Sequence, residues 1–175
     1  TAVHYDYDPE KARALLAEAG YPNGFSIEFW GYRDRPMVEA ILGNLAEVGI
    51  NASLNFVQAS AIATARDEGK LPIWFQAWGS NSVMDVSAGP GFWFGGNATD
   101  YARDAELTGF INEGGSTIDQ EAREEAYGKM VERLTDQAYT VPLFTYALNY
   151  AYNSQLEFTP VPDETPRFYE ARWAE

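Results

Sequence analysis

Residues 5–25 of the chain read YDYDPEKARALLAEAGYPNGF and mark both ends of one helix. Asp8 is placed to cap the first free backbone N–H groups, and Pro9 suits the first helical position because it has no N–H to leave unsatisfied. Gly20 can adopt the left-handed conformation that ends a helix, and Pro22 prevents the helix from continuing. The apolar spacing predicts one buried face, made of Ala12, Leu15, Leu16 and Ala19. We therefore expect a well-capped helix that leads directly into a strand.

Helix and strand patterns alternate through the first 78 residues. Alternating or continuous apolar runs predict strands, and apolar stripes at helical spacing predict helices. The expected strands are residues 25–31, 50–57 and 71–78, and the expected helices between them are residues 36–48 and 60–68. Strands joined by helices of this length imply right-handed crossovers and parallel pairing. The predicted fold class is therefore α/β, a three-layer lobe with a mainly parallel mixed sheet flanked by helices.

The second half of the chain predicts a long loop followed by two helices. Residues 79–101 are rich in Gly, Asn and Ser, and a loop of this length is typically functional. Asp104 is expected to cap a helix that stops at the Gly114-Gly115 pair, and Asp119 is expected to cap a longer helix. The charged side chains of the longer helix, Arg123 among them, predict a solvated face.

The end of the chain predicts two strands and an extended tail. The strands are expected at residues 141–146 and 149–153, joined by a turn. Residues 154–175 contain three prolines and show no periodic pattern before Phe168. Phe168, Tyr169 and Trp173 are too apolar for a free terminus. We therefore expect the tail to pack on another surface.

Composition and charge exclude several classes of function. A hydrophobic content of 46% indicates a packed globular chain, and a net charge of −14 would repel nucleic-acid backbones and anionic membranes. The absence of cysteine rules out disulfides, thiolate nucleophiles and Cys-ligated metals. His4 is the only histidine, so a His-based metal site and a Ser-His-Asp arrangement both lack support. We therefore expect no metal, no cofactor, no nucleic-acid partner and no catalytic residues of the Cys or His type.

One segment, residues 78–85, has the composition of a ligand site. It begins at the carboxyl end of an expected strand, where the ligands of open α/β sheets bind. An aromatic wall, small residues and short polar groups come together there, and more aromatic residues follow within reach. The predicted ligand-binding residues are Trp78, Ser80, Asn81, Asp85 and Trp93. An alternative stays open at this point, in which the aromatic residues are ordinary core and Asp85 caps a turn.

Five motifs in order resemble the C-terminal lobe of bacterial ABC-transporter substrate-binding proteins of the dipeptide, oligopeptide and nickel type. They are DPEKARALLAEAGY (8–21), LAEVGI (45–50), WGS (78–80), YARD (101–104) and VPLF (141–144). The resemblance covers nearly the whole chain and implies a periplasmic-binding-protein-like fold of type II. It also implies a periplasmic receptor without catalysis, which captures a peptide or peptide-like solute between two lobes and delivers it to a membrane permease.

The resemblance further implies roles for individual segments. Residues 1–153 would form the ligand-binding lobe, incomplete at its N-terminal side, and residues 154–175 would pack on a first lobe that is missing from this sequence. In peptide-binding members, the Trp of a Trp-x-x-Asp motif lines the pocket and the Asp pairs with the α-amino group of the ligand. Trp78 matches this motif, whereas Asn81 occupies the Asp position and lacks the charge. Asp85 could supply that charge if the loop folds back.

The ligand class stays open on this comparison. Phe75 stands where oligopeptide binders can place an Arg that holds a carboxylate. Modified peptides, amines, opines and sugars are therefore alternatives to a free peptide.

Two other classes of function remain open on the residues alone. With 26 acidic residues, the chain could be an extracellular glycan-acting hydrolase with paired carboxylates, or a carbohydrate-binding module. However, no acidic pair stands in an apolar setting that would raise a pKa, as a general acid requires. A stand-alone interaction module is the third class, and it would be favoured if the tail closed a compact core with residues 1–153.

Overall fold

The computed structural model describes residues 2–79, 83, 85–162 and 165–174. The chain forms two compact units. One unit is continuous and consists of residues 4–77, and the other combines residues 1–3 with residues 78–175. The boundary between Ala77 and Trp78 falls at the start of the predicted ligand segment, inside the stretch that the sequence predicts as one lobe.

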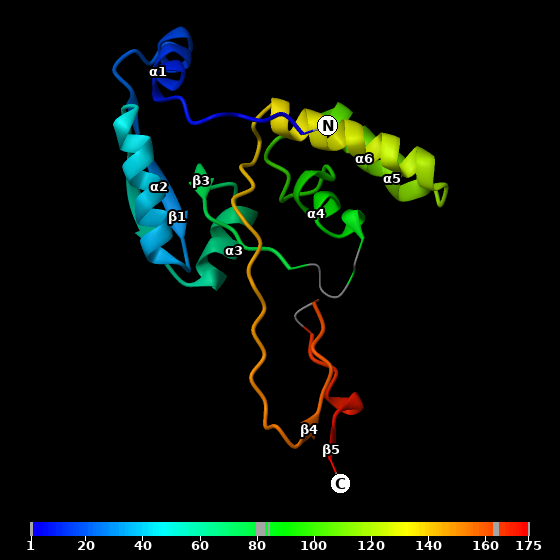
Figure 1. The fold of residues 1–175 in the computed structure, drawn as a ribbon. Helices are drawn as coiled ribbons and strands as arrows, with labels where there is room; N and C mark the ends of the chain where they lie inside the picture. Colours follow the sequence, from blue (N-terminus) through cyan, green and yellow to red (C-terminus); the bar gives the residue numbers. More distant parts are fainter. Residues whose placement is uncertain (1, 80–82, 84, 163–164, 175) are drawn as a thin grey trace. The chain divides into compact units, whose positions relative to one another are not determined.

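A three-stranded parallel sheet forms the frame of the continuous unit (Figure 1). Its strands are β1 (Phe25–Gly31), β2 (Ile50–Phe56) and β3 (Ile73–Trp74), in the order β2-β1-β3. β1 and β2 pair in register from Phe25 opposite Ile50 to Gly31 opposite Phe56, and β1 also pairs in parallel with β3. The predicted parallel α/β arrangement is confirmed for this unit.

Helices cover the two faces of this sheet. α2 (Arg35–Glu47) lies over one face and α3 (Ala59–Asp67) over the other. Phe29 and Trp30 show the division, because successive side chains of a strand point to opposite faces: Phe29 belongs to the cluster under α2, and Trp30 packs on the cluster under α3. The buried residues are Phe29, Val38 and Phe75 under α2, and Ile62, Ala65 and Leu71 under α3. The unit is three layers deep, as predicted.

α1 (Pro9–Glu18) begins and ends as the sequence predicts. The Asp8 side chain accepts a hydrogen bond from the Lys11 backbone N–H at 2.8 Å, and Gly20 has a φ of 91°. Its apolar stripe differs from the expectation, because no residue of α1 is buried among the described residues and Leu15 keeps 53% of its surface exposed. Caps need only sequence neighbours to form, whereas burial of the stripe needs a facing surface.

β3 is shorter than the strand predicted at residues 71–78, with two residues in the ladder. Pro72 lacks the N–H that a ladder requires. Beyond Phe75 the chain leaves the sheet, and the Ala77 N–H donates to the Tyr32 hydroxyl at 3.3 Å. The apolar run thus predicts a segment that is packed on both faces, but it does not predict how many of its residues pair with the neighbouring strand.

Gly24 and Gly49 approach each other closely where β1 and β2 begin. Gly24 has a φ of +69°, and a Cβ on it would lie 1.8 Å from the carbonyl oxygen of Gly49. The Phe25 N–H donates to that same oxygen at 3.2 Å, so this approach starts the parallel register. Only glycine meets both the positive φ and the lack of space.

Gly24→Ala should lower the free energy of unfolding by more than about 2 kcal/mol, because the added Cβ meets backbone and the residue is forced into positive φ. Gly43→Ala is the matched control. Gly43 lies in α2 with nothing within 4 Å of its ideal Cβ, and Ala is the better helix former by about 1 kcal/mol. Urea unfolding followed by circular dichroism measures both variants. Wild-type stability in Gly24→Ala would contradict the close approach.

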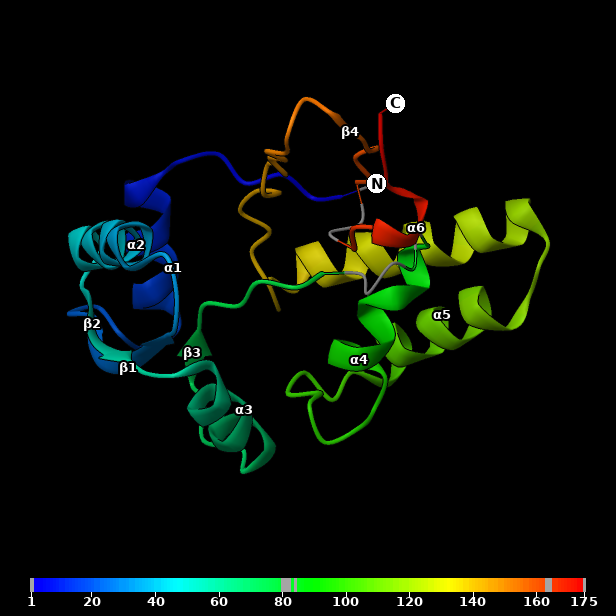
Figure 2. The ribbon, with the colours of Figure 1, turned by 90° about the horizontal axis from the view of Figure 1, so that it is seen from below.

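The second unit is built on helices (Figure 2). They are α4 (Pro90–Phe94), α5 (Ala105–Ser116) and α6 (Gln120–Asp136), preceded by a 3-10 turn η1 (Val86–Ala88). α5 and α6 lie side by side in both views and bury Leu107, Ile111, Tyr127 and Met130 between them. The segment predicted as one long loop therefore contains two short helical pieces. No helix in the described part of the chain has the length and apolar character needed to cross a membrane.

α5 runs through the Gly114-Gly115 pair, where the sequence predicts its stop, and ends at Ser116. Packing explains the difference, because a Cβ on Gly114 would lie 2.7 Å from the ring of Tyr127 on α6. Glycine here is a contact residue that lets a buried ring approach the α5 backbone. The caps of the two helices, Asp104 and Asp119, form as predicted.

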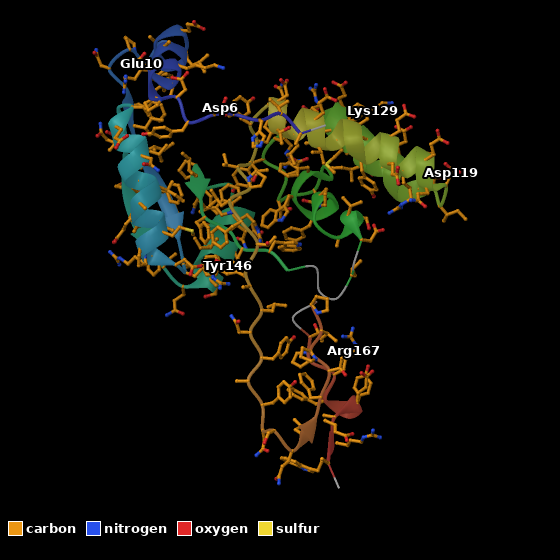
Figure 3. All side chains as sticks on the ribbon, viewed as in Figure 1. Asp6, Glu10, Asp119, Lys129, Tyr146 and Arg167 are labelled. Atoms are coloured by element: carbon orange, nitrogen blue, oxygen red, sulfur yellow. The ribbon has the colours of Figure 1, made fainter. Side chains whose placement is uncertain are left out.

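The chain after α6 is extended and differs from the prediction (Figure 3, in which Tyr146 is labelled). None of residues 141–153 forms a strand, because no described segment pairs with them. The tail instead contains β4 (Leu156–Glu157), η2 (Phe168–Glu170) and β5 (Arg172–Trp173), with β4 and β5 antiparallel. The Phe158 ring packs near Tyr152, with centroids 5.3 Å apart. Packing of residues 154–175 on another surface stays a prediction.

Candidate ligand-binding site

Three aromatic side chains form one cluster in the second unit. The Trp78 ring stacks on Phe92, with centroids 4.6 Å apart and planes at 25°. Trp93 meets both rings edge-on, its centroid 5.2 Å from that of Trp78 and 4.7 Å from that of Phe92. Aromatic pairs attract one another in these stacked and edge-on geometries. Trp78 still exposes 43% of its surface, so the cluster presents an aromatic face that another molecule can cover.

The short helix α4 carries two of these rings and is held from its C-terminal side. A helix of this length needs outside partners for its last carbonyl groups. The Asn97 side-chain amide donates to the Phe92 carbonyl oxygen at 3.1 Å. The Thr108 hydroxyl of α5 donates to the Phe94 carbonyl oxygen at 3.0 Å. These contacts fix the position of Phe92 and Trp93 relative to α5.

Asp85 lies at the start of η1 and directs its carboxylate into the unit. Its Oδ1 atom accepts a hydrogen bond from the Ser87 backbone N–H at 2.9 Å and so caps the turn. Both carboxylate oxygens accept from Nη2 of Arg123, each at 2.8 Å. Hydrogen bonds from Ser87, and then the Arg123 guanidinium, hold the pKa of Asp85 below its ordinary value. The carboxylate is therefore ionised and paired, in agreement with the turn-capping alternative.

Arg123 differs from its predicted place on a solvated face. Its side chain is 24% exposed, and Nη1 donates to the carbonyl oxygens of Gly114 at 2.8 Å and Thr117 at 3.4 Å. The guanidinium carbon lies 5.3 Å from the Tyr127 ring centroid. A charge on an acidic helix face gives no sign of the hydrogen-bond partners, because Asp85, Gly114 and Thr117 all lie outside α6.

The structure thus brings together two of the predicted ligand-binding residues, Trp78 and Trp93, and adds Phe92 to them. Asp85 lies on the connecting segment and contacts Arg123. Ser80 and Asn81 lie outside the described residues. Direct contact of any of these side chains with a ligand stays a prediction.

Asp104 joins α5, α6 and the start of the extended chain. It is 8% exposed and accepts from the backbone N–H groups of Glu106 and Leu107, both at 3.0 Å. Its Oδ2 atom accepts from Arg133 Nε at 2.7 Å and from the Tyr139 hydroxyl at 2.9 Å. Burial by itself would raise the pKa of Asp104, but the hydrogen bonds from Leu107, Arg133 and Tyr139 outweigh burial and lower the pKa to about 2.

Asp104→Asn should lower the free energy of unfolding near pH 7 by about 2 kcal/mol, because an amide replaces a charged acceptor of several hydrogen bonds. A carboxyl whose pKa falls from 3.8 to about 2 on folding stabilises the fold above the higher value, and this contribution is lost as the pH falls towards the lower one. The difference in the free energy of unfolding between wild type and Asp104→Asn should therefore narrow as the pH falls from about 4 to about 2. Urea unfolding across this pH range measures the difference.

Asp119→Asn provides the control for this experiment. Asp119 caps α6 by accepting from the Ala122 N–H at 2.9 Å, and Asn caps a helix about as well as Asp. This variant should therefore keep its stability near neutral pH. A stability difference in Asp104→Asn that did not change with pH would contradict the proposed ionic role of Asp104.

A hollow of about 460 Å³ lies beside the Asp85–Arg123 pair. Val86, Tyr127 and Val131 give it an apolar lining, and Glu124 adds a charge. Within the described ranges, no group of three or more His, Cys, Asp or Glu side chains is placed to hold a metal ion. The region therefore offers aromatic faces and apolar surface, which are suited to holding a molecule by contact.

Comparisons with known proteins agree with one another. The family model described as bacterial extracellular solute-binding proteins, family 5 Middle, matches residues 1–100. Heme-binding protein A of Haemophilus influenzae is 31% identical over 152 residues, which cover 79% of this chain and 28% of that protein. A glutathione-binding protein of Escherichia coli K12 is 44% identical over 70 residues, which cover 38% of this chain and 14% of that protein.

A solved structure supports the fold. The structure of HbpA2 from Haemophilus parasuis matches with a TM-score of 0.77 and 26% identity, over 99% of this chain and 37% of that chain. The predicted fold class, a periplasmic-binding-protein-like α/β lobe of type II, is confirmed by this match. The chain spans less than a third of the length of the heme-binding relative.

Proposed function

This chain belongs to the bacterial extracellular solute-binding proteins, family 5, and from that premise we propose that it forms one wall of the ligand cleft in the binding component of an ABC importer. The cluster of Trp78, Phe92 and Trp93 carries the proposal, because it leaves 43% of the Trp78 surface exposed on a fixed aromatic platform. Ligand sites are typically lined by such aromatic surface. The opposite wall would come from the part of the protein outside this chain.

The ligand that we propose is a peptide or peptide-like solute. The glutathione-binding relative supports this class, since glutathione is a small peptide. Asp85 is already paired with Arg123, so this wall offers aromatic contact more than a free charge. Solutes with a flat or apolar group are therefore favoured over solutes held by charge alone. The heme-binding relative makes heme a second compound to test.

The receptor that we propose binds its solute without catalysis. Hydrogen bonds and ion pairs lower the pKa values of three carboxyl groups, those of Asp85, Asp104 and Glu125. A glycan hydrolase needs a carboxylic acid with a raised pKa. The lowered values make these three carboxyl groups unsuited to the role of general acid.

A periplasmic location and a membrane permease as partner complete the proposal. The description of the family as extracellular supports the location. Binding proteins that close around a solute present a different surface when they are loaded. A permease can therefore distinguish the loaded form from the empty form by contact alone.

A ligand screen on the protein at its full natural length tests this function. Isothermal titration with glutathione, a dipeptide, heme and an oligosaccharide should show saturable binding of at least one peptide-like member. Binding of the oligosaccharide alone would favour the carbohydrate-binding alternative. Turnover of any compound without saturable binding would contradict the receptor.

Trp78→Ala should weaken binding of the ligand found in the screen by about 1 to 2 kcal/mol, roughly five- to thirtyfold, because it removes a stacking face. The melting temperature should change little, since Trp78 is 43% exposed. Tyr7→Ala is the control, as Tyr7 is an exposed aromatic residue of the other unit. Equal losses of binding and stability in Trp78→Ala would show that Trp78 only packs.

The tail supplies a separate proposal, namely that residues 154–175 pack on the part of the protein outside this chain. Phe168, Tyr169 and Trp173 are 69%, 82% and 65% exposed here, which is costly for large apolar side chains. In the natural-length protein, hydrogen exchange across residues 165–174 should be slower than in the isolated chain. Identical exchange rates in the two proteins would sink this proposal.

A further inference from the structure

Arg123 is a partly buried contact of the second unit, with a side chain 24% exposed, that the proposed function does not use. We propose that Arg123 is a positioning residue of the ligand wall: its guanidinium clamps Asp85 and thereby fixes the segment that holds Phe92 and Trp93 against Trp78. The geometry of the clamp is independent of the ligand. Its effect on binding rests on the proposed function.

The Arg123 guanidinium is bound on two sides at once. Nη1 donates to the Gly114 carbonyl oxygen at 2.8 Å, and Nη2 donates to both oxygens of Asp85 at 2.8 Å. The planar guanidinium has five N–H donors in fixed directions, which allows both contacts together. The carbonyl groups at the end of a helix lack partners within it. The end of α5 therefore holds Arg123 in place, and Arg123 holds Asp85.

Asp85 transmits this restraint to the aromatic cluster along a short structured segment. Asp85 caps η1, which leads directly into α4, the helix that carries Phe92 and Trp93. Asn97 and Thr108 hold the far end of α4. The clamp acts at the near end, so the segment is restrained on both sides of the two rings. Loss of the clamp should therefore loosen the 4.6 Å stack of Phe92 on Trp78.

The clamp also separates two roles for Asp85. As a counter-charge, Asp85 would contact the amine of a ligand directly. As half of the clamp, its charge is met by Arg123 within the protein, and it supports the wall for any ligand. The two roles predict different results for a ligand without a free amine. Substitution of Asp85 should weaken the binding of such a ligand if Asp85 is half of the clamp, and should leave its binding unchanged if Asp85 contacts the amine directly.

Indole N–H resonances of the 15N-labelled natural-length protein test the clamp without a ligand. Trp→Phe variants assign the peaks of Trp78, Trp93 and, as a reference in the other unit, Trp30. Arg123→Met, Arg123→Lys and Asp85→Asn should each shift or broaden the Trp78 and Trp93 peaks and leave that of Trp30 in place. Lys should fail to replace Arg because it lacks the planar fork. The double variant Asp85→Asn/Arg123→Met should shift these peaks no further than either single variant.

A neighbouring ion pair provides the matched control. Glu125 and Lys129 form an exposed pair at 2.6 Å on the same helix, where Lys129 is labelled in Figure 3. Glu125→Gln and Lys129→Gln should leave the indole peaks unchanged. Unmoved Trp78 and Trp93 peaks in Asp85→Asn would overturn the clamp whatever the ligand is. The Asp85 side chain is 44% exposed, so we expect this variant to fold.

Binding of glutathione and of N-acetylated glutathione tests the role of Asp85. Asp85→Asn and Arg123→Met should each weaken the binding of both compounds by the same factor. The expected factor is about tenfold, the size expected for loss of one charge-assisted contact. A loss confined to the compound with the free amine would overturn the positioning role in favour of direct contact. Failure of glutathione to bind the wild type counts against the proposed ligand class alone, because the indole peaks test the clamp independently.

Discussion

The buried carboxylate of Asp104 is the contact on which the second unit depends. It caps α5, receives Arg133 from α6 and receives Tyr139 from the start of the extended chain. Hydrogen bonds to an ionised acceptor are stronger than neutral ones, and their strength grows away from water. The helix pair fixed in this way supplies Thr108 and Arg123, which hold α4 and η1. The cluster of Trp78, Phe92 and Trp93 is therefore supported by the carboxylate of Asp104, a residue outside the cluster.

Features that depend on sequence neighbours could be predicted from the sequence. The caps at Asp8, Asp104 and Asp119 form as expected, because a cap is made within three residues of its own position. Parallel pairing could be predicted as well, since it follows from alternation of helices and strands. Where a partner is distant, the prediction differs from the structure. Gly114 looks like a stop until Tyr127 is seen beside it, and residues 141–153 have a strand pattern but no described strand to pair with.

The same division applies to the candidate site. The sequence singles out Trp78 and Trp93 because they follow the carboxyl end of an expected strand, where the ligands of open α/β sheets bind, and their contact with a ligand stays a prediction. Arg123 could not be predicted, since its partner Asp85 is 38 residues away and the charged face of an amphipathic helix is normally solvated. The sequence leaves two roles open for Asp85, contact with a ligand and capping of a turn. The Ser87 N–H and the Arg123 guanidinium, which both donate to its carboxylate, favour the structural role.

The discontinuity of the second unit has a consequence for the order of folding during synthesis. Val3 N–H donates to the Thr135 hydroxyl at 2.8 Å across 132 residues, so this unit joins the first residues of the sequence to the end of α6. Residues 4–77 form a contiguous unit between them, and its contacts can close as soon as that stretch leaves the ribosome. The parallel sheet can therefore be complete while the aromatic wall is still unassembled.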